Sequence, residues 1–331
     1  MAVPQGAARV ARTMSSSPPT TEAEKVVRPG TVPGEVPEAA AADRRRNFLH
    51  AVVVAIRPGE WIKNLFVLGP LVFSGLFDEA DQVVAALVTF GAFCAMASAG
   101  YLLNDLLDRE LDRQHPVKSL RPIASGDLPV GAAGAIAVLL VPLALGAGFA
   151  VAWDVAAMVA AYGVLTAAYS LGLKHVVIVD VMSIAALFLI RVLAGAIAID
   201  VTASSWLLLC TGMLALLLGF GKRRQEAVAE ETSNGARPVL EHYSEPFLDQ
   251  MMALVTAGTI ISYAIYAMES PIVGEKMIAT TPPVLYGIFR YLYLIYHRRD
   301  TRSTATLVAR DPGIVAAIAV WAITAVILLS T

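Results

Sequence analysis

The sequence is poor in charged residues and in cysteine. Charged side chains make up 16% of the 331 residues, whereas soluble domains carry roughly 25%. The two cysteines, Cys94 and Cys210, each lie inside an apolar run, so we expect two small packed residues and no disulfide framework. The first 43 residues also lack the apolar stretch of a secretory signal. These deficits argue against a soluble domain and against a disulfide-stabilised secreted one.

Apolar residues are abundant instead and make up 57% of the chain. Several apolar runs approach the roughly 20 residues that a helix needs to cross the hydrocarbon layer. Backbone groups inside a bilayer must bond internally, so each run is expected to be a helix. The predicted fold class is therefore all-α, a polytopic membrane protein with nine transmembrane helices. The predicted spans are 61–77, 83–104, 128–152, 155–173, 176–199, 203–221, 247–268, 280–297 and 312–330.

The domain organisation follows from a change in composition near residue 43. Residues 1–43 are rich in Ala, Pro, Ser, Thr and Glu and cannot bury a core, so we expect a disordered tail. Residues 44–331 are expected to form one transmembrane catalytic domain. The longest connection within it, about residues 222–246, is too short for a further domain.

Charges are distributed unevenly between the two sets of connections that alternate along the spans. Almost all basic residues fall in one set, near 44–63, 109–121, 174, 222–237 and 298–310. The other set is acidic and contains only one cation, Lys276. The positive-inside rule then predicts a multi-pass protein of the cell membrane whose N-terminus is cytoplasmic and whose C-terminus is outside.

The stretch NDLLDRELDRQHPVKSLRPIASG, residues 104–126, is densely charged although it follows an apolar run. Helical spacing places Asp105, Asp108 and Asp112 on one face, about 5–10 Å apart. A divalent cation relieves the repulsion between them, and Mg²⁺ is commonly held by carboxylates, waters and substrate phosphates. Lys118 and Arg121 follow and are suited to bind phosphate. The stretch therefore indicates a metal and phosphate site.

Two alternatives remain open at this point. The stretch can instead be a solvated interfacial loop whose charges pair with each other. Arg191, about 15 residues into a predicted span, also has two interpretations, because a charge inside a membrane is costly and usually functional. Arg191 either binds a ligand or forms a structural pair with a buried acid or carbonyl group.

The same stretch resembles the first aspartate-rich motif of the UbiA superfamily of intramembrane prenyltransferases, N-D-x-x-D-x-x-x-D followed by R-P. The resemblance covers about residues 48–330. It implies nine transmembrane helices around a central cavity that opens to the cytoplasm and laterally to lipid. It also implies that Asp105, Asp108 and Asp112 are catalytic and hold Mg²⁺.

The chain departs from the common family pattern after the sixth span. Most members carry a second acidic loop there, whereas this chain reads GKRRQE, residues 221–226. One branch, the decaprenyl-phosphate phosphoribosyltransferases, is similar in this segment. It is similar also in RPxxWxKN (57–64), in HPxKxxRPIASG (115–126) and in YSLGLKH with the later VD (169–180).

That branch implies transfer of a 5-phosphoribosyl group from phosphoribosyl pyrophosphate (PRPP) to a polyprenyl phosphate, here decaprenyl phosphate. Pyrophosphate leaves, and the product feeds arabinan precursors of a cell wall. The candidate substrate-binding residues are Lys63, Asn64, Asn104, Lys118, Arg121, Tyr169, Lys174, His175, Lys222, Arg223, Arg224 and Glu226.

Two other functions compete with this one. An ordinary prenyltransferase would use a prenyl diphosphate and a small acceptor, but the basic segment in place of the second acidic loop argues against it. An anion transporter would suit charges inside the membrane, but the charges gather on one membrane face. A homo-oligomer is compatible with the pattern, and a nucleic-acid partner is not expected.

Overall fold

A computed structural model describes residues 38–230, 243–269, 274–297, 307–308 and 310–329. The chain divides into two units, Met1–Asp43 and Arg44–Thr331, and the description below concerns the second. The expected disordered tail lies mostly outside the described residues, and its disorder stays a prediction.

The described part of the chain is helical and contains no strand within those ranges. The long helices are α1 (Glu38–Ile56), α3 (Ala80–Leu107), α6 (Val130–Val151), α7 (Trp153–Leu171), α8 (Val179–Ala198), α9 (Ser205–Glu230), α10 (Glu245–Met268), α11 (Thr281–His297) and α13 (Pro312–Leu329). Shorter elements are η1 (Pro58–Leu68), α2 (Gly69–Ser74), α4 (Arg109–Gln114), η2 (Lys118–Leu120), α5 (Pro122–Ser125), η3 (Leu173–His175) and η5 (Gly274–Thr280). The all-α prediction is confirmed.

Seven of the described helices are long and apolar enough to cross a membrane, namely α3, α6, α7, α8, α9, α10 and α13. The expected count of nine is not reached by this measure. The first predicted span, 61–77, is divided between the 3₁₀ helix η1 and the six-residue α2. The eighth, 280–297, is α11, which has 17 residues.

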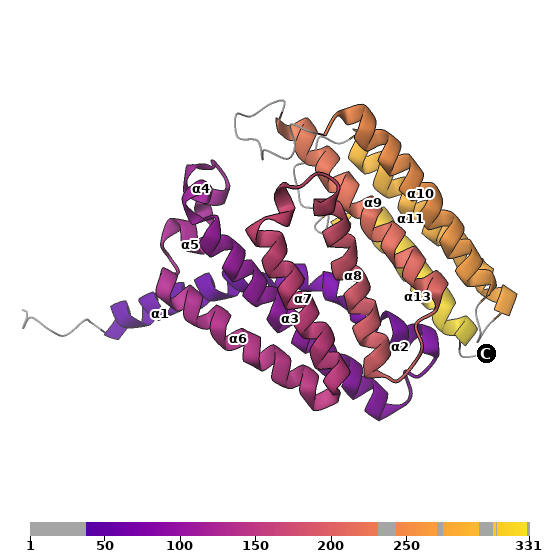
Figure 1. Ribbon diagram of the computed structural model, residues 1–331, viewed down its shortest axis with the longest axis horizontal. Helices are drawn as coiled ribbons and strands as arrows, with labels where there is room; N and C mark the ends of the chain where they lie inside the picture. Colours follow the sequence, from indigo (N-terminus) through magenta and orange to yellow (C-terminus); the bar gives the residue numbers. More distant parts are fainter. Residues whose placement is uncertain (1–37, 231–242, 270–273, 298–306, 309, 330–331) are drawn as a thin grey trace, which may run out of the picture. The chain divides into compact units, whose positions relative to one another are not determined.

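Helix α8 lies at the centre of the fold, between α7 on one side and α9 on the other (Figure 1). It also packs against η1, and the approach depends on Gly195. A side-chain carbon at that position would overlap the carbonyl oxygen of Val67, which is backbone and cannot rotate away. This close contact fixes η1 against α8 and thereby forms one wall of the central cavity described below.

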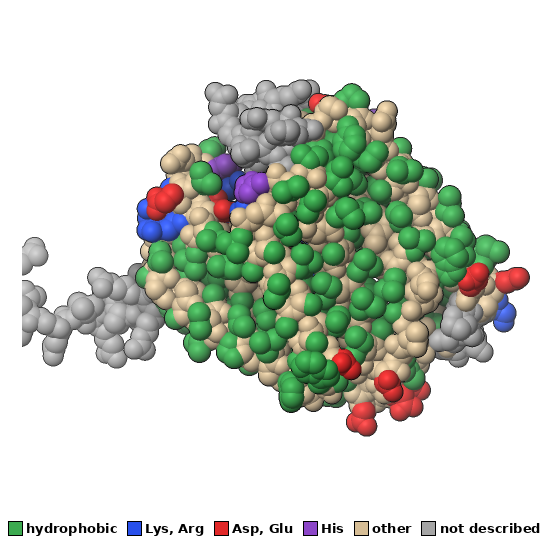
Figure 2. All heavy atoms as spheres, in the orientation of Figure 1, with side chains coloured by type: hydrophobic (Ala, Val, Ile, Leu, Met, Phe, Trp, Pro, Cys, Tyr) green, Lys and Arg blue, Asp and Glu red, His purple; other side chains and the backbone are tan. Residues whose placement is uncertain are grey.

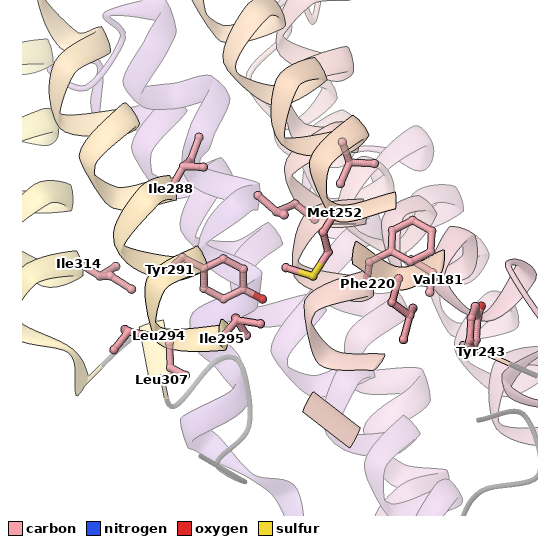
Figure 3. Close-up of a cluster of buried hydrophobic side chains, with 13 residues drawn as sticks. Val181, Phe220, Tyr243, Met252, Ile288, Tyr291, Leu294, Ile295, Leu307 and Ile314 are labelled. Atoms are coloured by element: carbon pink, nitrogen blue, oxygen red, sulfur yellow. The ribbon is translucent and has the colours of Figure 1, made fainter. Parts of the chain in front are cut away.

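A second group of contacts joins α8, α9, α10, α11 and α13 (Figure 3). Val181, Phe220, Met252 and Tyr291 are among its buried side chains. Lipid is as apolar as these side chains, so packing between helices and not burial from water holds such a cluster together. It supports the C-terminal half of α9, which carries the basic segment 221–226.

The surface agrees with a membrane environment. On the face in Figure 2, hydrophobic side chains cover the middle, and charged side chains gather at opposite edges. Large exposed apolar residues such as Leu139, Phe149 and Val164 lie on the spanning helices α6 and α7. Exposed apolar surface of this extent is stable in lipid but not in water.

Candidate functional site: a basic cavity beside the aspartate motif

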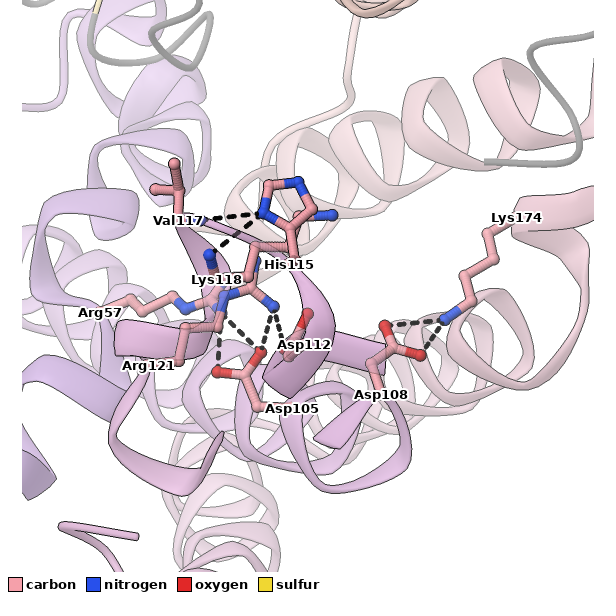
Figure 4. Close-up of polar contacts among 9 residues, drawn as sticks. All are labelled: Arg57, Asp105, Asp108, Asp112, His115, Val117, Lys118, Arg121 and Lys174. Carbon is pink, nitrogen blue, oxygen red and sulfur yellow. Dashed lines mark hydrogen bonds and ion pairs between the residues drawn. The ribbon is translucent and has the colours of Figure 1, made fainter. Parts of the chain in front are cut away.

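The aspartate motif is held by arginines. The Asp105 carboxylate is 3% exposed and accepts hydrogen bonds from Arg57 Nη2 at 2.6 and 2.7 Å. Arg121 Nη1 donates both to Asp105, at 3.1 Å, and to Asp112, at 2.6 Å (Figure 4). Two carboxylates from different helical turns therefore converge on one cationic nitrogen.

Asp108 lies apart from the other two. Helix α3 ends at Leu107, and Asp108, with φ −87° and ψ 3°, joins it to α4. Its carboxylate accepts hydrogen bonds from Lys174 Nζ at 2.8 and 3.0 Å, away from Arg121 (Figure 4). The expectation of three carboxylates on one continuous helical face is therefore wrong.

The physical reason is that basic residues relieve the repulsion that a metal was expected to relieve. Among the residues that the structure describes, no three His, Cys, Asp or Glu side chains form a group that could hold a metal ion. The alternative in which the charges of this stretch pair with each other describes part of the geometry, because four of its ion pairs are internal. Two further pairs bring in Arg57 and Lys174 from other segments.

The backbone of Arg57 is shaped for this role. Its φ of 53° places it in the left-handed region, which costs about 1–2 kcal/mol for a residue with a side chain. Pro58 follows it and disfavours the right-handed helical region for the residue before it. The twofold hydrogen bond to Asp105 and the approach of the guanidinium to the Tyr101 ring, at 5.2 Å, offset that cost.

A cavity of about 360 Å³ opens beside the motif. Its walls come from η1, α3, α7, α8 and α9. The basic residues in its lining are Arg57, Lys63, Arg121, Arg191 and Lys222, and none of the described lining residues is acidic. Apolar side chains such as Phe66, Leu187 and Leu218 form the rest. A space with this lining suits a ligand that has several anionic groups and an apolar part.

Several predicted residues line this cavity, namely Lys63, Asn104, Arg121, Tyr169 and Lys222. Lys63 also pairs with Glu60 in η1, and Lys222 lies 3.9 Å from Glu226 in α9. Lys118 is half-buried in the turn before Arg121, and His175 is exposed at the end of η3. The structure therefore joins five of the twelve predicted substrate-binding residues in one space.

The basic segment after the sixth predicted span is divided among three surroundings. Lys222 lines the cavity. Arg223 is fully buried and donates to Asp180 at 2.5 Å and to the Tyr169 hydroxyl at 2.9 Å, with Glu226 as a further partner. These contacts use Arg223 to fix α9 against α7 and α8.

The Arg224 side chain has different partners from those of Lys222 and Arg223. It donates to Asp249 of α10 at 2.6 Å and lies 4.1 Å from the centre of the Tyr296 ring of α11. The prediction that Arg223 and Arg224 bind phosphate directly therefore disagrees with their packing. The reason is that successive residues of a helix point about 100° apart, so a run of three cations cannot face one ligand.

Asn64 has a positioning role that differs from the predicted one. Its side chain is buried, donates to Cys94 Sγ at 3.3 Å and accepts a hydrogen bond from Arg191 Nε at 2.7 Å. Arg191 also donates to the Leu187 carbonyl at 2.9 Å and to the Tyr162 hydroxyl at 2.7 Å. From the sequence, a buried acid or a carbonyl group was considered as the structural partner of Arg191. The structure shows the carbonyl group.

The turn that carries Arg121 depends on His115. Its Nδ1 accepts the backbone N–H groups of Val117, at 3.1 Å, and Lys118, at 3.3 Å (Figure 4). Both bonds require an unprotonated Nδ1. Partial burial, and then the positive charge of Lys118, lower the pKa of His115 below 6.5. The imidazole thus stays neutral and keeps the turn closed near neutral pH.

Sequence reasoning missed three contributors to this site. Arg57 was noted only as part of a motif, and Tyr101 and Tyr162 gave no signal because aromatic residues are common in membrane spans. Arg191 did give a signal, as a charge inside an apolar run. Its surroundings were not predictable, since its partners come from η1 and α7.

Comparisons with known proteins agree with this architecture. Residues 67–321 match the UbiA prenyltransferase family. A decaprenyl-phosphate phosphoribosyltransferase of Mycolicibacterium smegmatis is 37% identical over 237 residues, which are 70% of this chain and 74% of that protein. One of Corynebacterium glutamicum is 34% identical over 74% of this chain and 77% of that protein.

A solved structure has the same fold. A UbiA homolog from Archaeoglobus fulgidus, bound to GPP and Mg²⁺, matches with a TM-score of 0.65 and 16% identity, over 85% of this chain and all of that one. The chain therefore belongs to the UbiA prenyltransferase family, and the resemblance seen in its motifs is confirmed. With its apolar helices, it is a multi-pass membrane protein.

Proposed function

We propose that this protein transfers the 5-phosphoribosyl group of PRPP to decaprenyl phosphate or a similar polyprenyl phosphate. The two relatives with 34% and 37% identity are named for this activity. The observation that carries the proposal is the cavity lining, with five basic residues and no acidic one among those described. PRPP has phosphate groups at both ends of its ribose, and the lipid brings one more.

The reaction needs little from the side chains beyond binding and orientation. An oxygen of the lipid phosphate forms a bond to C1 of the ribose, the bond from C1 to the pyrophosphate oxygen breaks, and pyrophosphate leaves with the electron pair. A phosphate monoester is already anionic near neutral pH, so no side chain has to remove a proton. Arg57, Arg121 and Lys222 orient the phosphates, and electrostatic positioning of this kind lowers the barrier.

We infer that a divalent cation, Mg²⁺, assists at the aspartate motif. The donor set fits, because the hard carboxylate oxygens of Asp105 and Asp112 converge on one cationic position, now taken by Arg121 Nη1. Asp108, the third ligand named from the sequence, pairs with Lys174 instead, so waters and substrate phosphates would complete the coordination. When bound, Mg²⁺ would neutralise charge on the departing pyrophosphate. The Mg²⁺ in the fold neighbour from A. fulgidus supports a divalent metal.

The cytoplasmic location of the active site and the role in a cell-wall arabinan pathway belong to the same proposal. PRPP is a water-soluble metabolite, so the basic edge must face the compartment that supplies it. The many basic residues on the side of α4, α5 and η3 agree with a cytoplasmic edge.

The test uses the full chain in lipid nanodiscs with PRPP labelled in the ribose, decaprenyl phosphate and Mg²⁺. We expect a labelled lipid product and one pyrophosphate per transfer. A parallel reaction receives geranyl diphosphate and a small aromatic acceptor. Product in the second reaction with none in the first would replace the proposal with ordinary prenyl transfer. EDTA should abolish the product, and added Mg²⁺ should restore it.

A further inference from the structure

Arg191 differs from every other basic residue of the cavity. It is 3% exposed and lies within the spanning helix α8. Arg57 and Arg121 pair with Asp105, Lys63 with Glu60, and Lys222 with Glu226. Within the described part of the chain, Arg191 has no carboxylate within ion-pair distance.

A buried cation without an anion is unfavourable. Moving one charge out of water costs several kcal/mol even after the protein relaxes. In a buried ion pair, the attraction between the two charges offsets this cost. A charge inside a membrane segment is accordingly a strong indication of function. Hydrogen bonds to neutral acceptors offset part of this cost, but they do not neutralise the charge of the guanidinium. The position therefore favours an anionic ligand.

The neutral partners of Arg191 fix its orientation. Nε donates to Asn64, one terminal nitrogen to the Leu187 carbonyl and the other to the Tyr162 hydroxyl. The rings of Tyr162 and Phe188 lie 4.6 and 5.2 Å from the guanidinium carbon. A guanidinium has five N–H groups, so these contacts leave N–H groups for a ligand in the cavity that Arg191 lines.

The position of Arg191 defines an inner end of the cavity. Tyr162, its partner, lies seven residues before Tyr169 on α7, which corresponds to about 10 Å along the helix. Tyr169 lies near the end of α7 that leads to Lys174, the partner of Asp108. It also accepts a hydrogen bond from Arg223, the neighbour of Lys222. It therefore belongs to the outer end, beside the aspartate motif and Lys222. The cavity thus carries positive charge at both ends, and Thr166, which lies between Tyr162 and Tyr169 on α7, lines the space between.

We propose that Arg191 binds a phosphate group of a substrate at the inner end of the cavity, apart from the pyrophosphate bound at the outer end. This inference rests on the proposed function. The phosphate is either the 5-phosphate of PRPP or the phosphate of the lipid, because both are tetrahedral anions that accept paired hydrogen bonds from a guanidinium. Asn64 and Tyr162 act as positioning residues for it.

The experiment compares wild-type protein with Arg191→Gln in nanodiscs. Dissociation constants are measured for PRPP, decaprenyl phosphate and inorganic pyrophosphate by ligand-dependent thermal stability. We expect Arg191→Gln to weaken the binding of either PRPP or decaprenyl phosphate by at least about tenfold, the worth of one charge-assisted hydrogen-bond pair. Pyrophosphate binding should stay within about twofold, because it reports the outer end.

The ligand that loses affinity identifies the source of the phosphate. Lys276→Gln is the matched control, since it removes one exposed positive charge outside the cavity and should leave all three constants unchanged. Equal losses for all three ligands, or no loss for any, would overturn the inference. If Arg191→Gln does not fold, Arg191→Lys retains the charge but not the planar donor pair, and unchanged affinities in that variant would also overturn it.

The outcome also separates this inference from the proposed function. Wild-type protein that forms no phosphoribosylated lipid refutes the function. Wild-type protein that forms it, beside an Arg191→Gln variant with unaltered dissociation constants, refutes only the role of Arg191.

Discussion

At the scale of single residues, the three aspartates of the motif have different surroundings. Asp105 is buried and bound by two arginines, Asp112 shares one of them, and Asp108 pairs with Lys174. Asp105 thus connects Arg57 of one segment with Arg121 of another, and both arginines line the cavity. A change at Asp105 therefore affects the placement of two cations of the cavity together.

We therefore predict that Asp105→Asn lowers kcat/KM of the transferase reaction by at least about 100-fold, the range seen when one preorganised electrostatic group is removed. Asp127→Asn is the control, because Asp127 is exposed nearby and bonds only to Ser125 among the contacts described. Initial rates over a range of PRPP and Mg²⁺ concentrations provide the measurement. Activity of Asp105→Asn within about threefold of wild type would contradict the role given to this carboxylate.

His115 gives a prediction for pH. Its pKa in the fold is lower than 6.5, through burial and the charge of Lys118. The fold therefore favours the neutral imidazole, so its stabilising contribution is complete above about pH 6.5 and is lost as the pH falls below that value. Protonation of Nδ1 removes the bonds to the backbone N–H groups of Val117 and Lys118.

Hydrogen–deuterium exchange at these two amides provides the measurement. After correction for intrinsic exchange, protection should fall by about two- to tenfold between pH 7.5 and 5.5, the worth of a neutral hydrogen bond. In His115→Ala the protection should already be low at pH 7.5 and should not change further. The same pH dependence in the variant and in the wild type would assign the effect to another group.

At the scale of elements, the end of α9 shows how a helix distributes a basic run. Arg223 is enclosed with Asp180, both 0% exposed in their side chains, whereas Arg224 contacts a partly exposed Asp249. Removing one member of a buried pair leaves the other charge without compensation, which costs about 3–5 kcal/mol. A partly exposed pair is worth about 1 kcal/mol or less.

Arg223→Gln should accordingly lower the unfolding temperature by roughly 5–15 °C, and Arg224→Gln by no more than about 4 °C. Thermal unfolding of both variants in the same detergent is the measurement. Arg224→Gln should also leave pyrophosphate affinity unchanged, whereas Lys222→Gln should weaken it. A stable Arg223→Gln protein with weakened pyrophosphate binding would restore the direct phosphate role predicted from the sequence.

The elements also show which predictions a sequence supports. Long apolar runs predict helices well, because lipid leaves the backbone few other conformations. The pairing of Asp108 with Lys174 was not predictable, since Lys174 lies 66 residues later in the chain. Likewise η1 takes a 3₁₀ form where a regular span was expected, and its position depends on the contact of Val67 with Gly195.

At the scale of the whole molecule, the sequence predicted which residues belong to the polar edge but not which of them face one space. The uneven distribution of charge between the connections is visible in the order of residues along the chain, so the sequence alone predicted it. The cavity needs five elements from separate parts of the chain, and its inner cation, Arg191, is positioned by η1 and α7. That convergence is a property of packing and was beyond pattern analysis.

The orientation in the membrane is the remaining prediction at this scale. Asp127, between α5 and α6, and Glu269, at the end of α10, are both exposed. The spanning helices α6, α7, α8, α9 and α10 separate them. An odd number of crossings places the two positions on opposite faces, whatever path η1, α2 and α11 take. The positive-inside rule assigns Asp127 to the cytoplasm and Glu269 to the outside.

Single substitutions Asp127→Cys and Glu269→Cys, probed with a membrane-impermeant maleimide, test this orientation in intact cells. We expect labelling of Glu269→Cys in intact cells and of Asp127→Cys only after permeabilisation. The wild-type chain is the background control, because Cys94 is buried and Cys210 is partly buried within a spanning helix. The reverse labelling pattern would place the basic cavity outside the cytoplasm, away from the compartment that supplies PRPP, and would count against the proposed substrate as well as the orientation.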